Sequence, residues 1–540
     1  MRAMVLSTPG APLQRPDRAD AGDRMTVSTE SDARRQEDVF AFLTDPVTHP
    51  HVHRIDTHAA SVFLEGDRAL KIKRAVCFAF LDYSTLDKRK AACDEEIRIN
   101  RPFAPQIYRR VIPITQADDG SLSIDGDGTP VEFAIEMNRF DERQTIDHLA
   151  ETGPPDPDLV DSIADAIAAS HIVAPHAPVE PWIASIPALI EDNTTAFRTA
   201  ACFPENDIED LRQASQSAWS GVRGLLQRRG QQGYIRRCHG DLHLANIVLI
   251  EGKPVLFDAI EFDPVIASVD VLYDLAFPVM DFIRYGRQAA ANALLNRYLG
   301  TTSSDNLDAL AALPLFMSLR AAIRAKVLLA GLDRAGRDKA TAMQSARAYF
   351  ELARRLIHPP PPTLVAIGGL SGTGKSVAAR AVAPFVAPEP GAVVLRSDVL
   401  RKQHFQVSET DRLPGSAYRP EKTARIYQIL VQRAGRALSQ GHSVVVDAVF
   451  AHETERAAIC AAARDLNIRF VGLFLVTDLA TRLDRIGSRK GDASDATAEI
   501  AGLQEKYDIG GVDWTFIDAS GTSEQTLLRC QSRITQGGPA

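Results

Sequence analysis

The stretch Gly369-Leu-Ser-Gly-Thr-Gly374-Lys375-Ser376 decides the fold of the second half of this chain. It matches the pattern G-x-x-x-x-G-K-[ST] at every fixed position, and it follows Thr363 to Ile367, an apolar run typical of a buried strand. Glycines let successive backbone N–H groups turn inward around a phosphate, and the helix that follows adds its positive N-terminal end. The stretch therefore predicts a phosphate-binding loop between a strand and a helix.

The residue types in this loop predict how it binds ATP. Lys375 can reach the β- and γ-phosphates, and the hydroxyl of Ser376 can hold Mg²⁺. The backbone of the loop completes the cofactor-binding set, which comprises Gly369, Leu370, Ser371, Gly372, Thr373, Gly374, Lys375 and Ser376. The alternative is an accidental glycine-rich turn between a strand and a helix.

Strand and helix patterns alternate around this loop. Apolar runs at 392–395, 444–446 and 470–476 predict further strands, with helices between them. This alternation predicts an α/β P-loop NTPase fold at residues 363–537, with a parallel sheet and helices on both of its faces.

Two carboxylates follow strands of the predicted sheet. Asp398 comes shortly after the strand at 392–395, and Asp447 ends the strand at 444–446. The carboxyl ends of parallel strands face the crevice where ligands bind, and a carboxylate at the position of Asp447 can orient water on Mg²⁺. For Asp398, a helix N-cap is the structural alternative.

These motifs resemble those of the P-loop small-molecule kinases, a group that includes gluconate-kinase-like, polynucleotide-kinase-like and zeta-toxin-like enzymes. The resemblance covers roughly residues 363–535. It implies that Asp398 takes the proton from the accepting hydroxyl and that Arg401 clamps the substrate. It also implies an arginine-bearing lid, in which Arg485 acts on the transferring phosphoryl group and Arg489 binds the nucleotide. A solvated helix face is the alternative for each lid arginine.

A second motif, Cys238-His-Gly-Asp-Leu-His-Leu-Ala-Asn246, is the most informative stretch of the first half. Asp241 and Asn246 match the D-x-x-x-x-N spacing of a kinase catalytic loop, and Asp258 ends an apolar run further on. Phosphoryl transfer to an alcohol needs a carboxylate beside the hydroxyl and metal ligands on the same side. The motif predicts such a site, although a loop of turn-forming residues is the alternative.

The His-Gly-Asp of this motif and the run Asp258-Ala-Ile-Glu-Phe-Asp263 resemble the aminoglycoside phosphotransferase and choline kinase family. The resemblance implies a protein-kinase-like α+β fold at residues 37–357, with a small β-rich lobe and a larger helical lobe. By the same resemblance, Asp241 is the catalytic base, and Asn246 and Asp258 are ligands of Mg²⁺. The family name does not identify the substrate.

The small lobe offers candidate ligands for the nucleotide. Residues 61–73 predict two strands around a tight turn, which places Lys71 and Lys73 on the same face of one strand. Either lysine could contact the α- and β-phosphates, and we prefer Lys71. A glutamate of the next helix should pair with that lysine, and we prefer Glu96 over Glu95. The G-x-G-x-x-G loop of protein kinases is missing from this lobe.

The remaining elements of the first half follow from its apolar patterns. Strands are expected at 111–114 and 131–137 and a strand-like island at 247–260, and helices at 85–100, 157–171, 208–227, 287–299 and 307–356. Residues 136–140, between the lobes, are the expected hinge whose backbone meets adenine.

Two segments of low apolar content delimit the predicted domains. Residues 1–36 are rich in Pro, Arg, Asp and Ser and predict a disordered tail, within which Met25 is an alternative start. Residues 358–362 contain four consecutive prolines, which favour stiff polyproline II and predict a linker between the two domains.

The composition of the 540-residue chain excludes several functional classes. Lys and Arg (61) against Asp and Glu (69) give a net charge of −8, which disfavours a nucleic-acid coat or a polybasic membrane binder. No apolar run approaches the roughly 20 residues that span a bilayer. The six cysteines are widely spaced and form no C-x-x-C pair, which predicts a reducing compartment, the cytoplasm.

Together, the motifs predict a bifunctional ATP-dependent phosphotransferase. Each domain is expected to use ATP and Mg²⁺ and to transfer the γ-phosphoryl group to a hydroxyl of a small molecule. One alternative makes the first domain a nucleotide-binding regulator without catalysis. Others make the second domain a motor or switch NTPase, or a kinase that acts on nucleic-acid ends, which the net charge disfavours. The oligomeric state stays open.

Overall fold

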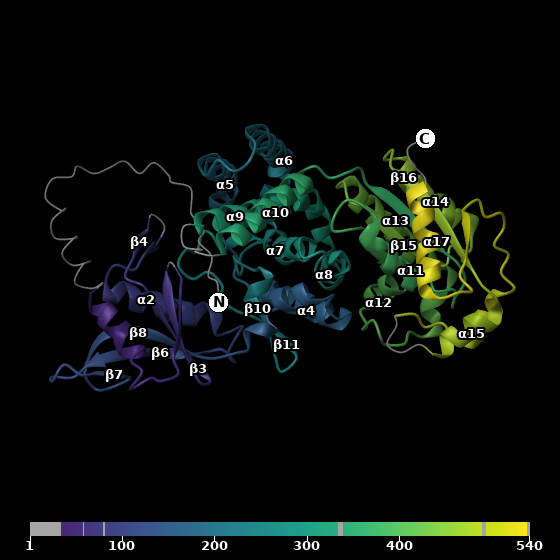
Figure 1. The fold of residues 1–540 in the computed structure, drawn as a ribbon. Coiled ribbons are helices and arrows are strands. Elements are labelled where there is room, and N and C mark those ends of the chain that lie inside the picture. Colours follow the sequence, from purple (N-terminus) through teal and green to yellow (C-terminus); the bar gives the residue numbers. More distant parts are fainter. Residues whose placement is uncertain (1–33, 58, 79–80, 333–337, 489–492, 537–540) are drawn as a thin grey trace. The chain divides into compact units, whose positions relative to one another are not determined.

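The computed structural model describes residues 34–57, 59–78, 81–332, 338–488 and 493–536 (Figure 1). The chain forms two compact units. The first unit comprises residues 1–285 and 315–354, and the second comprises residues 286–314 and 355–540. Across the described ranges, none of the helices combines the length and the apolar character that crossing a bilayer requires.

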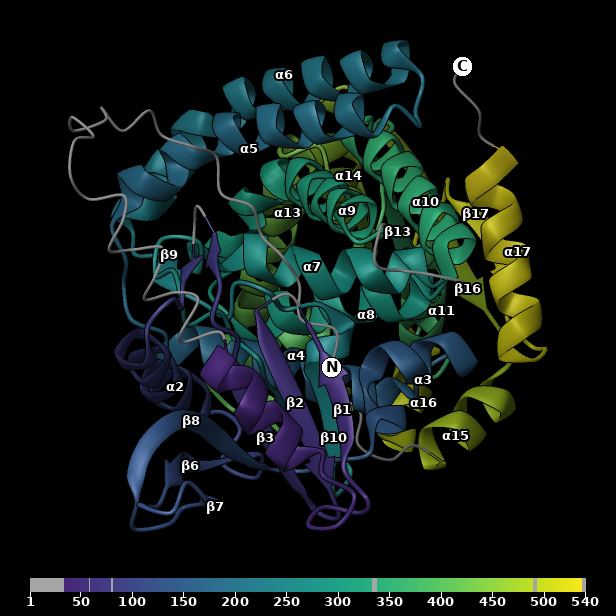
Figure 2. The same ribbon diagram turned by 60° about the vertical axis from the view of Figure 1, so that its left-hand side comes forward.

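The first unit begins with a small lobe built on a six-stranded antiparallel sheet (Figure 2). Its order is β1 (His53–Asp56), β2 (Ala60–Glu65), β3 (Arg68–Lys73), β8 (Thr129–Asn138), β6 (Tyr108–Gln116) and β7 (Leu122–Ile124). Helix α2 (Leu86–Asn100), which the Thr85 hydroxyl caps, packs on this sheet through the fully buried Cys93. A short hairpin of β4 (Cys77–Phe78) and β5 (Leu81–Asp82) joins β3 to α2. The predicted strand pair and helix of this lobe are confirmed.

Residues 34–43 form a helix that covers the opposite face of the sheet. Its Gln36 is buried and donates hydrogen bonds to Lys73 O (2.8 Å) and Glu132 Oε2 (2.7 Å). The predicted tail of 1–36 is therefore three residues too long, because Gln36 satisfies two buried acceptors of the sheet. Residues 1–33 lie outside the described ranges.

The larger lobe of the first unit is helical. Its helices are α3 (Ile146–Thr152), α4 (Pro157–Val173), α5 (Val179–Ala200), α6 (Glu205–Gln231), α7 (Val271–Arg284), α9 (Leu313–Ala330) and α10 (Lys339–Ile357). Its strands are β9 (Ile235–Arg237), paired with β12 (Ser268–Asp270), and the hairpin of β10 (Ile247–Ile250) and β11 (Lys253–Leu256). The strand-like island at 247–260 is thus a hairpin that ends at Leu256. The single helix expected at 307–356 is a 3₁₀ helix (Ser304–Ala312) followed by α9 and α10.

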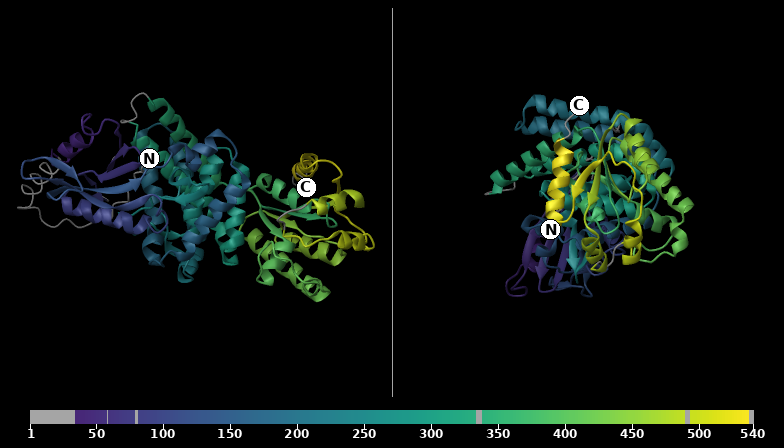
Figure 3. Two further views of the ribbon diagram at one scale, coloured as in Figure 1. Left: turned by 90° about the horizontal axis from the view of Figure 1, so that it is seen from below. Right: turned by 90° about the vertical axis from the view of Figure 1, so that its right-hand side faces the viewer.

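The second unit is built on a five-stranded sheet whose strands are all parallel. The order is β14 (Val393–Arg396), β15 (Val444–Asp447), β13 (Thr363–Gly368), β16 (Arg469–Val476) and β17 (Thr515–Asp518). The helices are α11 (Lys375–Val382), α12 (Ser397–His404), α13 (Pro420–Ser439), α14 (Glu453–Arg464), α15 (Leu479–Gly487), α16 (Ala498–Gln504) and α17 (Ser523–Gln536), and they lie on both faces (Figure 3). The predicted α/β architecture is confirmed.

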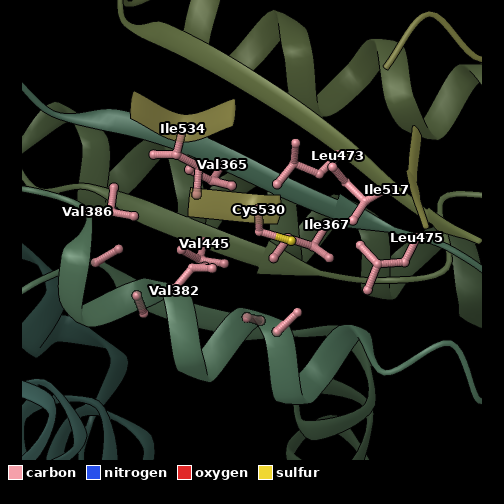
Figure 4. Close-up of a cluster of buried hydrophobic side chains, with 14 of the residues drawn as sticks. Val365, Ile367, Val382, Val386, Val445, Leu473, Leu475, Ile517, Cys530 and Ile534 are labelled. Carbon is pink, nitrogen blue, oxygen red and sulfur yellow. The ribbon is translucent and has the colours of Figure 1, made fainter. Parts of the chain in front are cut away.

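A dry core fixes the central strands of this sheet. Val382 of α11 and Cys530 of α17 pack against Val365, Val445 and Leu473 of three neighbouring strands, and all are buried (Figure 4). β13 is the central strand of this sheet, with β15 and β14 on one side and β16 and β17 on the other. The loop that follows β13 therefore lies at the point where the strand order reverses. Ligands of such sheets bind at that point.

Helix α8 (Gln288–Thr301) belongs to the second unit, although the sequence analysis placed it in the domain at 37–357. Asn292 Nδ2 donates to Ala392 O (3.0 Å), and Asn296 Oδ1 accepts from Val394 N (2.7 Å). These two asparagines satisfy backbone groups at the edge strand β14, which has no strand neighbour on that side among the described residues. The second unit therefore includes a segment that lies about 50 residues before the proline linker, by the unit bounds.

The buried His442 gives the second unit a pH-dependent stability. It donates from Nε2 to Gly391 O (2.9 Å), and burial lowers its pKa from 6.5 to about 4. Because the folded pKa lies below the unfolded one, this stability is complete above pH 6.5 and is lost as the pH falls toward 4. We expect a loss of about 3 kcal/mol between pH 7 and pH 4.

This effect can be measured by urea unfolding that is monitored through the hydrogen exchange of the β15 amides. The variant His442→Asn should have lower stability at pH 7 but a flatter pH profile. The exposed His404, replaced by Asn, is the matched control and should keep the profile of the parent chain. An unchanged profile in His442→Asn would mean that other groups cause the pH dependence.

Candidate active sites

The phosphate loop of the second unit needs its glycines. Gly369, Gly372 and Gly374 have φ values of +137°, +90° and +93°, which residues with a side chain rarely adopt. A Cβ on Gly372 would also lie 2.7 Å from the backbone oxygen of Arg482 in α15. The loop can therefore form and pack only with glycine at these positions.

Two predicted ligands meet at the end of this loop. Ser376 Oγ donates to Asp447 Oδ2 (2.6 Å), and Arg396 Nε lies 3.2 Å from the same oxygen. Lys375 Nζ donates to Leu370 O (3.1 Å) across the loop. The hydroxyl and the carboxylate thus come together from β15 and α11, as the sequence predicts.

Asp398 interacts electrostatically with Asp447 and with Lys375. Burial raises its pKa above 3.8, and the negative charge of Asp447 raises it further, whereas Lys375 and a hydrogen bond from Ser494 oppose the shift. A carboxylate with a raised pKa is a better proton acceptor. Its place at the start of α12, after β14, fits the base predicted from sequence.

The guanidinium of Arg401 contacts residues of the segment 415–423, which follows α12 and includes the start of α13. Arg401 NH1 donates to Ala417 O (2.7 Å) and NH2 to Thr423 Oγ1 (3.3 Å), and the guanidinium lies 4.6 Å from the centre of the Tyr418 ring. Within the described part of the chain, its Nε has no hydrogen-bond partner although the atom is buried. Arg401 therefore supports the segment 415–423, and its role as a substrate clamp stays a prediction.

The arginines of α15 hold the phosphate loop by its backbone. Arg485 NH1 donates to Thr373 O (3.3 Å), and its NH2 donates to Ala519 O (2.9 Å). Sequence reasoning missed Arg482, which is buried and donates from Nε to Ser371 O (2.8 Å). The sequence could not distinguish the role of Arg482 from that of Arg485, because residues three apart lie on the same face of a helix. The predicted Arg489 lies outside the described residues.

Gln504 at the end of α16 is a second residue that the sequence analysis missed. Its Oε1 accepts a hydrogen bond from Ser371 N (2.7 Å), and its side chain is buried. Both backbone groups of Ser371 are thus held by the segment that follows β16. No pattern in the sequence connects Gln504 with a loop more than a hundred residues earlier.

In the first unit, the structure brings together Lys71 of β3, Glu96 of α2 and Asp258. Lys71 Nζ lies 2.7 Å from Glu96 Oε1 and 2.7 Å from Asp258 Oδ1. The rejected alternative, Glu95, instead pairs with Arg98 at the surface. Asp258 has a φ of +62°, an uncommon value for a residue with a side chain, and its N–H donates to the hydroxyl of Tyr108 (3.1 Å).

This buried group is ionised. Burial alone would lower the pKa of Lys71, but Asp258 and Glu96 raise it well above 10.5. Burial would likewise raise the pKa of Asp258, yet Lys71 lowers it to about 2. The lysine is therefore a fixed positive charge at neutral pH, beside an oxygen ligand that is fully deprotonated.

Asp241 is the carboxylate of the predicted catalytic loop. Asn246 Nδ2 donates to Asp241 O (2.9 Å), and His243 Nε2 lies 3.4 Å from Asp241 Oδ2. Burial would raise the pKa of Asp241, but His243 and Arg324 outweigh it and lower the pKa. Its buried Oδ1 has no hydrogen-bond partner within the described ranges. An unpaired buried oxygen is costly, so this atom can accept a hydrogen bond from a group that enters the site.

Helix α7 supports this loop through two aspartates that the sequence analysis did not single out. Asp274 accepts from His239 N (3.2 Å) and Gly240 N (3.0 Å), and Asp281 accepts from Leu244 N (3.1 Å). His171 Nε2 of α4 also lies 3.2 Å from Asp274 Oδ2, so this buried histidine packs against α7. The loop is thus held at three backbone amides by one rigid helix.

A cavity of about 490 Å³ opens between the small lobe and the segment that leaves it. It is lined by His53, Ile55, Leu64, Gly66, Asp67, Arg139, Phe140, Asp141, Glu142 and Arg143. The predicted hinge at 136–140 contributes Arg139 and Phe140 to this lining. His53 and Ile55 of β1 and Leu64 of β2 also line this cavity.

The donor sets of both units fit Mg²⁺. Hydroxyl, amide and carboxylate oxygens are the ligands that this hard cation prefers. Ser376 and Asp447 already place two such oxygens 2.6 Å apart in the second unit. In the first unit, Asn246 directly precedes β10 and Asp258 comes two residues after β11, so the paired ends of this hairpin bring the two residues near each other.

Comparisons with known proteins agree with this division. Residues 364–507 match the AAA domain family. An uncharacterized protein of Mycobacterium tuberculosis is 28% identical over 496 residues, which cover 89% of this chain and 95% of that protein.

Solved structures match each half of the chain. A choline/ethanolamine kinase family protein from Mesorhizobium loti covers 62% of this chain and 99% of its own, at 14% identity and a TM-score of 0.33. A gluconokinase from Sinorhizobium meliloti covers 32% and 93%, at 19% identity and a TM-score of 0.24. By their own strand order, helices and loops, the first unit has a protein-kinase-like fold and the second a P-loop NTPase fold, as predicted.

Proposed function

We propose that the chain is a bifunctional ATP-dependent phosphotransferase whose two units each transfer the γ-phosphoryl group of ATP to a hydroxyl of a small molecule. One observation carries the proposal for both units. In the second unit, Asp398 interacts with both Asp447 and Lys375, which come from other elements. In the first unit, His239 interacts with both Asp241 and Asp258, and Asp258 pairs with Lys71. ATP binding alone would not require the carboxylate.

In the second unit, Lys375 and the backbone of the loop bind the phosphates of ATP. Asp398 accepts the proton as the substrate oxygen forms its bond to the γ-phosphorus, while the bond from that phosphorus to the bridging oxygen of ADP breaks. Ser376 and Asp447 would hold Mg²⁺, which would neutralise part of the phosphate charge. The raised pKa of Asp398 supports this role, because its carboxylate is a stronger base than an exposed one.

In the first unit, Asp241 has the corresponding role. Its unpaired Oδ1 accepts the hydrogen bond of the substrate hydroxyl and then the proton. Lys71, held by Glu96, contacts the α- and β-phosphates, and Asn246 and Asp258 would hold Mg²⁺. A regulator that only binds nucleotide would have no use for Asp241 Oδ1, which therefore favours catalysis over the regulatory alternative.

A cytoplasmic location is part of the proposal, because all six cysteines are free thiols, as expected of a reducing compartment. Nucleic-acid ends are the remaining alternative acceptor for the second unit. A 5′-hydroxyl oligonucleotide offered with labelled ATP tests this alternative directly. We expect no transfer of label, and efficient transfer would replace the small-molecule assignment of that unit.

Nucleotide stoichiometry tests the proposal for the whole chain. Calorimetry of the full chain with ATP and Mg²⁺ should give two binding sites, and removal of Mg²⁺ with a chelator should weaken both. The exposed Asp127, replaced by Asn, provides a control that should keep both sites. One site per chain, or two sites that ignore Mg²⁺, would contradict the proposal.

A further inference from the structure

Lys73 of β3 makes a second set of ion pairs beside those of Lys71. The carboxylate of Glu96 is divided between the two lysines, with Oε1 2.7 Å from Lys71 Nζ and Oε2 2.5 Å from Lys73 Nζ. All three side chains are buried, and Glu96 is fully so. The alternation of side chains along β3 explains why both lysines reach the same helix.

Together with the pairs of Lys71, the ion pairs of Lys73 link five charged side chains into a ring, which the backbone of residues 258–261 closes. Lys73 Nζ lies 2.5 Å from Glu261 Oε1, which also accepts from the hydroxyl of Tyr83 (3.2 Å). Glu261 is three residues beyond Asp258, the partner of Lys71. The segment 258–261 is therefore attached to the small lobe at both ends, once by each lysine.

Two lysines face three carboxylates in this buried ring. Stability alone does not account for such a ring, because well-packed apolar side chains often stabilise a core as much as buried ion pairs do. What the ring supplies is a defined position, since each of its members fixes the geometry of the next.

We propose that Lys73 and Glu261 form a positioning pair, which holds the segment 258–263 against the small lobe while Lys71 exchanges Asp258 for the phosphates of ATP. The inference rests on the proposed function of the first site. When Lys71 turns to the nucleotide, Glu96 keeps Lys73 as a partner and Asp258 keeps its place. Asp258 is then free to serve as a metal ligand without a movement of its backbone.

The test uses the full chain with Lys73→Met and Glu261→Gln combined, which removes the pair without leaving either charge alone. Two amides report on the segment, because Ala259 N donates to Asn100 Oδ1 (2.7 Å) and Ile260 N to His239 O (3.0 Å). Hydrogen exchange at these amides, without any ligand, should become about tenfold faster or more.

A second readout concerns the metal. In a chain that also carries Lys375→Ala, the Mg²⁺ concentration at half-maximal turnover of the first site should rise by about tenfold, as for other residues that support metal ligands. Lys73→Arg, which keeps a cation at this position, should raise the required Mg²⁺ concentration less than the double variant does. This variant also covers the case in which the double variant does not fold.

A second buried ion pair of the same lobe provides the matched control. Arg89 of α2 and Glu132 of β8 lie 2.9 Å apart and are equally buried, but neither forms an ion pair with a member of the ring. Arg89→Met with Glu132→Gln should lower the melting temperature while exchange at 259 and 260 and the Mg²⁺ dependence stay as in the parent.

Two results separate this inference from the proposed function. If exchange at 259 and 260 changes no more in the Lys73/Glu261 variant than in the control, the positioning pair is wrong. If exchange accelerates as expected but the parent chain neither binds ATP nor turns over at the first site, the pair stands and the proposed function of that site fails.

Discussion

Replacing Lys375 with alanine should lower phosphorylation by the second site at least about 100-fold, with little change in the fold. In the proposed reaction, this lysine of the phosphate loop strengthens its contact with the γ-phosphoryl group as charge develops during transfer. Loss of one preorganised electrostatic group costs roughly 2–4 kcal/mol of transition-state stabilisation. The measurement is the rate of product formation by the full chain, with circular dichroism as the test of folding.

The exposed Lys422 of α13 provides the control for this substitution. Lys422→Ala removes the same charge from the same unit and should leave the rate as it is. Activity of the second site that survives in Lys375→Ala would remove the phosphate loop from the chemistry. Activity lost equally in both variants would point to an effect of net charge.

Asp241→Asn should lower turnover of the first site by roughly 10²–10⁴-fold while ATP binding stays nearly unchanged. Asparagine keeps the shape of the side chain and its neighbours, but it cannot take the proton of the substrate hydroxyl. Asp258→Asn should instead weaken Mg²⁺-dependent ATP binding as well as turnover, because it removes a charged ligand of the metal. Calorimetry in a Lys375→Ala background compares the two variants against one constant second site.

The regulatory alternative gives a different pattern. If no hydroxyl is attacked in the first unit, Asp241→Asn changes nothing that can be measured there. Equal ATP affinity in both variants and in the parent, with no turnover in any of them, would contradict the kinase assignment of this unit. The second unit would then be the only enzyme of the chain.

Local patterns explain why much of the architecture could be predicted. The alternation of side chains on a strand places Lys71 and Lys73 on one face, and the charged helix after them leaves few glutamates as partners. The structure adds what spacing could not show, which is that Glu96 is shared by both lysines. Sequence separation alone does not say how many partners one carboxylate has.

Other features depend on contacts between distant segments. Helix α7 was missed because residues 271–283 are mostly apolar and include Pro278, a residue that is uncommon inside a helix. Its Asp274 therefore carried no visible link to the catalytic loop. Helix α8 was predicted as an element, but its attachment to the second unit depends on Asn292 and Asn296, whose partners lie about 100 residues away.

The central claim is that two separate sites each transfer a phosphoryl group to a small molecule. The direct measurement incubates the full chain with a metabolite extract and ATP labelled with ¹⁸O in the γ-phosphate, and identifies labelled products by mass spectrometry. The parent, Lys375→Ala, Asp241→Asn and the double variant are compared. We expect two sets of labelled products, one lost with each single substitution and both lost in the double variant. Label that reaches only inorganic phosphate, or one product set that neither substitution removes, would contradict the account.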